Sequence, residues 1–229
     1  MVSPDCSTTW DGERFAGDLT AALVERLAGY RDFGLLARAV AESAAVAEEA
    51  CLGRSMVCAA GCFYCCVLNV AVLLPEAMVI ADYLRRDLAQ SDLADLRARL
   101  VTHSNGARWM NDEERIIREA ICPLLDRAGH CMIHPVRPLV CRAVVSLDRD
   151  RCRAAFSPII SDEVRLVPTD LLRQTVFDTA FRSLAQSLRH HGFDARSIEL
   201  GAGLRAFLEY PEYCEQLLSG GRLPDELWQ

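Results

Sequence analysis

The sequence predicts a mainly α-helical fold: a single helical domain with an irregular, cysteine-rich metal-binding insert. One small β-hairpin can form within that insert. Two observations lead to this class. Apolar residues recur every three or four positions in long segments at both ends of the chain, which is the period of an amphipathic helix. Between these segments, residues 122–168 are interrupted by prolines, Gly129 and four cysteines, a composition typical of irregular structure.

The N-terminal helices are expected over residues 13–29 and 33–51. In the first of them, Leu19, Leu23 and Leu27 repeat at four-residue intervals, so they fall on one face of the helix. This spacing predicts that both helices pack one apolar face against the core.

The elements that follow are shorter. Residues 68–74 are expected to be extended, and the proline and glutamate at positions 75 and 76 suit the first turn of a helix over 75–88. Further helices are expected over 91–101, capped by Ser91, and over 112–121, 169–190, 202–208 and 212–218.

The chain length of 229 residues fits one domain with a sizeable core. We therefore describe residues 1–229 as a single domain. It divides into N-terminal helices (13–57), a cysteine-cluster metal-binding core (58–152) and C-terminal helices (168–229).

Composition argues against several classes of function. The net charge of −7 does not suit a protein that binds the phosphate backbone of nucleic acids. The first residues lack the basic and apolar regions of a signal peptide, and the apolar run over 67–74 is far shorter than the roughly 20 residues of a membrane span. We expect a cytoplasmic protein that contacts neither membrane nor nucleic acid and that acts with a redox partner or a substrate.

The chain contains eleven cysteines, an odd number that does not suit a framework of disulfides in a reducing compartment. Clustered thiolates instead bind zinc or iron–sulfur clusters. A closed structural zinc site takes only four ligands, so the surplus favours an iron–sulfur cluster, [4Fe–4S] above all, or two metal sites; zinc remains the alternative. The candidate ligands are Cys58, Cys62, Cys65, Cys66, Cys122, Cys131, Cys141 and Cys152.

A second interpretation of the first cysteines is structural. Within CAAGCFYCC, residues 58–66, the cysteines stand at i, i+4, i+7 and i+8, which would line one buried face of a helix. Gly61 disfavours that helix. Cys6, Cys51 and Cys214 stand apart from the clusters, and we expect them to be structural.

Two arginines flank Cys141 in the stretch HPVRPLVCR. Arg137 and Arg142 can donate hydrogen bonds and positive charge to cluster sulfurs, or they can hold an anionic substrate through bidentate contacts. The alternative is that they are surface arginines paired with acidic neighbours. His130 and His134, on either side of Cys131, are weaker ligand candidates.

Three stretches together resemble the YkgJ family of cysteine-cluster proteins, described as zinc- or iron-chelating with a CxxCxxCC signature. These are CAAGCFYCC, LLPEAMVIADYL and CPLLDRAGHCMIHPVRPLVCR, within about residues 58–152. The resemblance implies metal binding and no particular reaction. The spacing here is C-x3-C-x2-C-C, so the resemblance leaves Cys58 as the least certain ligand.

Two further resemblances suggest enzymes. A similar cysteine cluster occurs in flagellin lysine methylases, which implies an S-adenosylmethionine-dependent protein-modifying enzyme as another alternative. The pattern C-x3-C-x-aromatic-C, with Tyr64 at the aromatic position and Cys65 at its end, resembles the cluster loop of radical S-adenosylmethionine enzymes. The alternation of strands and helices that builds their barrel does not follow here. The hypotheses are therefore a redox or catalytic iron–sulfur protein, a structural zinc-binding interaction domain, and a methylase-like enzyme.

Overall fold

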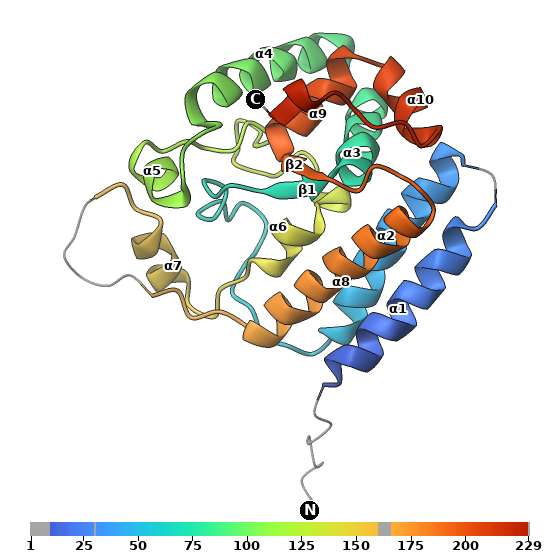
Figure 1. Cartoon of the computed structure of the whole chain (residues 1–229). Coiled ribbons are helices and arrows are strands. Elements are labelled where there is room, and N and C mark those ends of the chain that lie inside the picture. Colours follow the sequence, from blue (N-terminus) through green and yellow to red (C-terminus); the bar gives the residue numbers. More distant parts are fainter. Residues whose placement is uncertain (1–9, 30, 160–165, 229) are drawn as a thin grey trace, which may run out of the picture.

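The computed structural model describes residues 10–29, 31–159 and 166–228, and it confirms a mainly helical fold with one small antiparallel sheet (Figure 1). Cys6 lies outside the described residues. The helices are α1 (Gly12–Leu27), α2 (Phe33–Ala50), α3 (Leu74–Asp87), α4 (Gln90–Ala107), α5 (Asp112–Ile117), α6 (Leu139–Ala143), α7 (Arg149–Ala155), α8 (Leu171–His190), α9 (Leu200–Glu209) and α10 (Glu212–Leu218). Two short 3-10 helices, His134–Val136 and Asp225–Trp228, and the strands β1 (Ala71–Leu73) and β2 (Ser197–Glu199) complete the elements.

Aspartates begin several of the helices. Asp11 and Asp32 precede α1 and α2, and each side chain accepts a hydrogen bond from a backbone N–H of the first turn. These bonds satisfy donors that the helix itself leaves unpaired. At α3, the Glu76 carboxylate accepts the backbone N–H of Leu73 at 3.0 Å, as the expected preference for an acidic first turn suggests.

The expected bounds of two helices are wrong. Helix α4 begins at Gln90, so Ser91 lies inside the helix and does not cap it, and the helix continues beyond residue 101 to Ala107. Its later turns persist because Ser104 and Ala107 are buried against the rest of the protein. Helix α5 ends at Ile117, four residues early.

The insert is less irregular than expected, because α6 and α7 lie within residues 122–168. Pro138 precedes α6, where its fixed φ angle does not interrupt helical hydrogen bonds. The Asp148 side chain accepts the backbone N–H of Arg151 at 2.9 Å and so caps α7.

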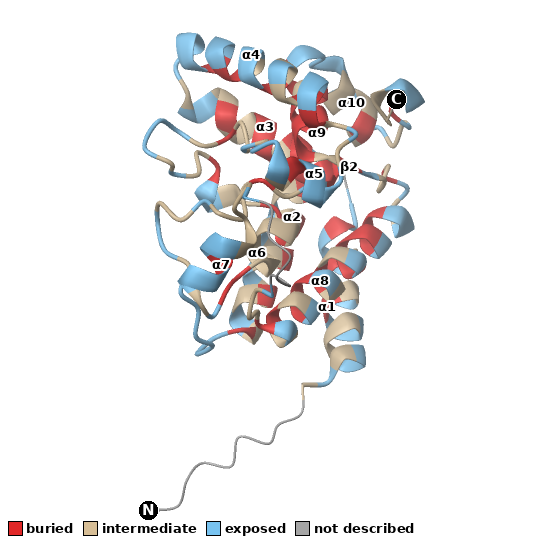
Figure 2. Cartoon of the chain, turned by 90° about the vertical axis from the view of Figure 1, so that its left-hand side faces the viewer, coloured by how far each residue is buried: buried red, intermediate tan, exposed pale blue. Residues whose placement is uncertain are grey.

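The core is formed by two groups of helices. Helices α1, α2 and α8 pack against one another, and α3, α4 and α9 form the second group, with α2 and α3 in contact between the groups (Figure 1). Figure 2 shows buried residues concentrated where these helices face one another, whereas α5 and α7 are largely exposed. Within the described ranges, no helix is both long and apolar enough to cross a membrane.

The small sheet joins distant parts of the chain. Strand β1 follows the cysteine loop and pairs antiparallel with β2 near the C-terminus, with Val72 opposite Ile198. A second antiparallel contact, the isolated bridge between Leu125 and Cys131, closes a loop inside the insert. The sheet therefore fixes the end of the cysteine loop against α3 and α9, both of which contact β1.

Candidate metal centre

The cysteine loop, residues 58–66, consists of successive turns and contains no helix. The backbone N–H groups of Cys62 and Cys66 donate to the carbonyls of Ala59 and Phe63, at 3.0 and 2.9 Å. Gly61 has a φ angle of 81°, a conformation that glycine adopts without steric strain. The interpretation of these cysteines as one buried helix face is therefore wrong.

The second group of cysteines is joined to this loop by the backbone. The N–H of Cys122 donates to the carbonyl of Cys66 at 2.7 Å. Residues 122–131 then turn back on themselves, because the Asp126 carboxylate accepts the backbone N–H groups of Ala128 and His130, each at 2.8 Å. This turn brings Cys131 back beside the start of the insert.

Four thiols share one neighbourhood, and we call them the inner thiols: Cys65, Cys122, Cys131 and Cys141. They come from the cysteine loop, the turn that follows Cys122, and α6, and the pKa of Cys141 is raised by burial and by the other three. Burial likewise raises the pKa of Cys131, and it raises that of Cys122 to about 12. A hydrogen bond with Cys66, followed by burial, raises the pKa of Cys65. The inner thiols are consequently protonated at neutral pH when they bind nothing.

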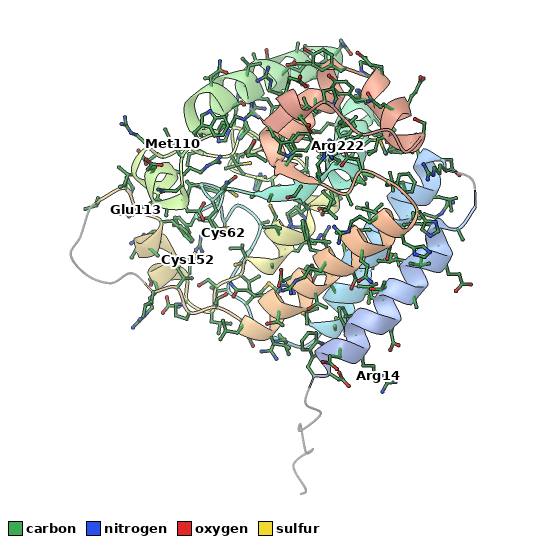
Figure 3. All side chains as sticks on the ribbon, viewed as in Figure 1. Arg14, Cys62, Met110, Glu113, Cys152 and Arg222 are labelled. Carbon is green, nitrogen blue, oxygen red and sulfur yellow. The ribbon has the colours of Figure 1, made fainter. Side chains whose placement is uncertain are left out.

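Three further thiols, which we call the outer thiols, are Cys58, Cys62 and Cys152, and the first two act together with Cys65 on the third. Burial, and then the neighbouring Cys65, Cys62 and Cys58, raise the pKa of Cys152 to about 11. Figure 3 labels Cys62 and Cys152, which come from the cysteine loop and α7 and lie in one region of the molecule. Ser146 links this group: its backbone N–H donates to the Cys58 sulfur at 3.4 Å, and its side chain is hydrogen-bonded to Cys152.

All ten cysteines in the described ranges are free thiols. The groups that shift the pKa of Cys51 and Cys214 besides burial are charged side chains, so neither belongs to the inner or the outer thiols. His130 is exposed and lies 3.5 Å from the Asp126 carboxylate, and His134 is exposed next to Arg137. Neither histidine is tied to the thiols by a hydrogen bond among the described residues.

The chemistry of this donor set suits a thiophilic metal, although the side chains are not arranged around a common point. Among the described residues, no three Cys, His, Asp or Glu side chains are placed to hold one metal ion. Ligation therefore requires the thiols to rotate toward a shared centre and to lose their protons. Soft, clustered thiols fit zinc or an iron–sulfur cluster better than they fit a hard cation such as magnesium.

The two arginines beside Cys141 occupy different environments. Arg142 donates from Nε to the carbonyl of Arg137 at 2.7 Å and from a terminal nitrogen to that of Pro135 at 3.0 Å, and it lies 3.5 Å from Glu48. Its guanidinium thus holds the loop before α6. Arg137, in contrast, has a buried Nε without a hydrogen-bond partner in the described structure. Its positive charge lowers the pKa of Cys65, Cys131 and Cys141, against the larger effect of burial.

Three residues important to this arrangement were not identified from the sequence. Glu48 of α2 pairs with Arg142 and, at 2.7 Å, with the buried Arg173 of α8, and Ser146 joins Cys58 to Cys152. Arg173 also donates to the carbonyl of Arg142 at 2.8 Å. No local motif could have revealed them, because each acts across a long sequence separation.

Comparison with known proteins identifies one family. Its model, described as "CxxCxxCC: Putative zinc- or iron-chelating domain", matches residues 57–157, which include all eight candidate ligands. No curated protein and no solved structure matches the chain. Metal binding is the function that the family description supports. Residues 57–157 are thus similar to the CxxCxxCC family of cysteine-cluster proteins, the YkgJ-type family that the sequence resembles.

Proposed function

We propose that this protein holds an iron–sulfur cluster, [4Fe–4S], through the inner thiols and uses it in a redox reaction with a partner or substrate. The observation that carries the proposal is that four cysteines from separate segments are close enough to raise one another's pKa, with the Arg137 guanidinium beside them. Four is the number of thiolates that such a cluster takes.

The surroundings of the inner thiols support a negatively charged centre. Four thiolates brought into one buried site repel one another, and Arg137 is the positive charge that lowers the pKa of Cys65, Cys131 and Cys141. Its unpartnered Nε–H is a donor that a thiolate or sulfide can accept, which would remove the cost of leaving it unbonded. An iron–sulfur cluster supplies one-electron exchange when bound; the chain supplies the ligands, the charge and the exclusion of water.

The outer thiols extend the same site. Cys58, Cys62 and Cys152 lie next to Cys65 and are additional to the four ligands that the cluster requires. We propose that they are redox-active thiols or ligands of a second site. We further propose that the protein acts in the cytoplasm, a reducing compartment in which clustered free thiols persist.

A structural zinc site is the second candidate. Four buried cysteines also complete a closed zinc site, and zinc would bind the cysteine loop, the insert and α6 to one another. In this case the metal would stabilise the fold, and the protein would present a surface to a partner without redox chemistry.

Metal and sulfide analysis of protein purified without oxygen tests the proposal. We expect a brown protein with iron and acid-labile sulfide. Cys141→Ser should lose both, whereas the control Cys214→Ser, which lies outside both thiol groups, should keep them. A colourless protein with stoichiometric zinc would contradict the iron–sulfur proposal and support the zinc candidate.

A further inference from the structure

A groove of about 270 Å³ lies between α2, α3 and the segment before α6, and Arg137 is one of the residues that line it. One wall is apolar and made of small side chains of α2, including Ala37, Val40, Ala41 and Ala44, and the facing wall carries Val136 and Ile80. The volume is below the roughly 300–1,000 Å³ of sites for drug-sized molecules, so the groove suits a small ligand.

The charged side chains that line the groove are Arg137, Arg142, Glu48 and Glu76, and Arg137 is the arginine of these without a charged partner among the described residues. Arg142 and the neighbouring Arg173 both pair with Glu48, so two cations share one carboxylate. The other acidic residue, Glu76, is fully buried and accepts the backbone N–H groups of Leu73 and Leu139, at 3.0 and 2.9 Å. It is therefore engaged with the backbone, and Arg137 has no ion pair with a described residue.

The charge of Arg137 also acts on His134, whose pKa it lowers more than burial does. A further positive charge beside Arg137 is therefore disfavoured, whereas an anion there is favoured.

We propose that this groove binds a small organic monocarboxylate with a short aliphatic body. The Arg137 guanidinium holds the carboxylate through charge-assisted hydrogen bonds, and the aliphatic part lies along the alanine and valine wall of α2. Because Arg137 also acts electrostatically on Cys65, Cys131 and Cys141, the bound carboxylate lies next to the thiol centre.

The inference deepens the proposed function, since it names the class of substrate or effector that reaches the metal centre. Binding of the carboxylate depends on the guanidinium and the groove, and not on which metal the thiols hold. The two proposals can therefore fail separately: metal analysis tests one, and ligand titration tests the other.

Titration calorimetry of the full chain with hexanoate is the experiment, with hexan-1-ol and inorganic phosphate as probes that lack the carboxylate or the aliphatic body. We expect binding of hexanoate and at least about tenfold weaker binding of the other two. Arg137→Gln should weaken hexanoate binding about tenfold or more, and Arg137→Lys should restore part of it, because a lysine keeps the charge without the bidentate geometry.

Each substitution in the groove has a matched substitution elsewhere on the surface, which shows whether a change in hexanoate binding is specific to the groove. Ala41 is exposed on the groove wall, so Ala41→Leu should fill the groove and weaken hexanoate binding, while Ala94→Leu on the exposed face of α4 should not. Arg127→Gln, which removes an exposed arginine of the insert, should leave binding unchanged. Unchanged binding in both Arg137→Gln and Ala41→Leu, or phosphate binding as tight as that of hexanoate, would overturn the proposal.

Discussion

Arg142 donates a 2.7 Å hydrogen bond from its Nε to the backbone carbonyl of Arg137, so one arginine fixes the backbone from which the other extends toward the thiols. The second bond of Arg142, to Pro135, holds the same loop from its other side. Both arginines flank Cys141 in the sequence, but their roles differ. Arg142 holds the loop through hydrogen bonds, and Arg137 places a positive charge near the inner thiols.

The first prediction concerns this loop. Arg142→Ala should lower the free energy of unfolding by about 2–3 kcal/mol, because two carbonyls and Glu48 lose a charged donor. Arg142→Lys should recover less than half of the loss, since one ammonium group cannot reproduce the fork geometry. Urea unfolding measures the effect, and Arg127→Ala is the exposed control. A loss below about 0.5 kcal/mol for Arg142→Ala would show that the loop does not depend on this side chain.

The second prediction separates inner from outer thiols. Cys122→Ser removes a buried inner thiol, so we expect it to abolish metal binding, whereas Cys62→Ser should retain more than about half of the metal. Metal content per chain, measured after anaerobic purification, gives the answer. Equal loss in both variants would mean that the inner and outer thiols form one ligand set.

The third prediction follows from the raised pKa values of the thiols. Because the pKa of Cys122 is about 12 and those of Cys131 and Cys141 are also raised, these thiols carry protons near pH 7 and must release them on ligation. Metal affinity should therefore rise with pH, about tenfold per pH unit for each proton released. Competition with a chelator between pH 6.5 and 8 measures this slope, and an affinity independent of pH would contradict it.

The fourth prediction concerns the ion pair between Asp170, which caps α8, and Arg54, in the segment before the cysteine loop. The hydrogen bond from Arg54 holds the pKa of Asp170 below its ordinary value. A lowered carboxyl pKa stabilises the fold above the pKa of the unfolded chain, and this contribution is lost as the pH falls through the folded-state pKa. The protein should lose this part of its stability on acidification below about pH 4.

Two substitutions distinguish the contribution of the Asp170–Arg54 ion pair to stability from that of the helix cap. Asp170→Asn can still accept the N–H of Arg173, so it should lose only the ion pair. The free energy of unfolding should fall by about 0.5–1 kcal/mol, because the Arg54 side chain is 42% exposed and water screens its charge. Asp170→Ala should lose about 1 kcal/mol more. Thermal unfolding at pH 7 and pH 3 checks both, and the difference between wild type and Asp170→Asn should shrink at pH 3. A constant difference would contradict the assignment.

Most helices could be predicted from the sequence because their signals are local. The leucines at positions 19, 23 and 27 are buried as their spacing indicates, and the predicted segments 33–51, 169–190 and 212–218 correspond to α2, α8 and α10. The predictions were wrong where packing outweighs local preference, as at Ser91, and where short helices form inside a proline-rich segment, as for α6.

The pairing of the two strands in the small sheet could not be predicted from the sequence. The extended character of residues 71–73 is a local property, but their partners are residues 197–199, near the other end of the chain. Hydrophobic period and turn residues do not encode a pairing over that separation. In the folded chain, α3 and α9, the helices that follow the two strands, are packed against each other.

By itself, the sequence determined the helical class, the thiol chemistry and the set of eight candidate cysteines, because period, composition and spacing are properties of short segments. Only the tertiary structure divided seven of those thiols into inner and outer groups, placed Cys66 in a hydrogen bond with Cys65, and separated Arg137 from Arg142. Glu48 and Arg173 hold Arg142 from other helices, and Ser146 joins Cys58 to Cys152. The charge and hydrogen bonds around a thiol arise from neighbours in space, and those neighbours exist only once the chain has folded.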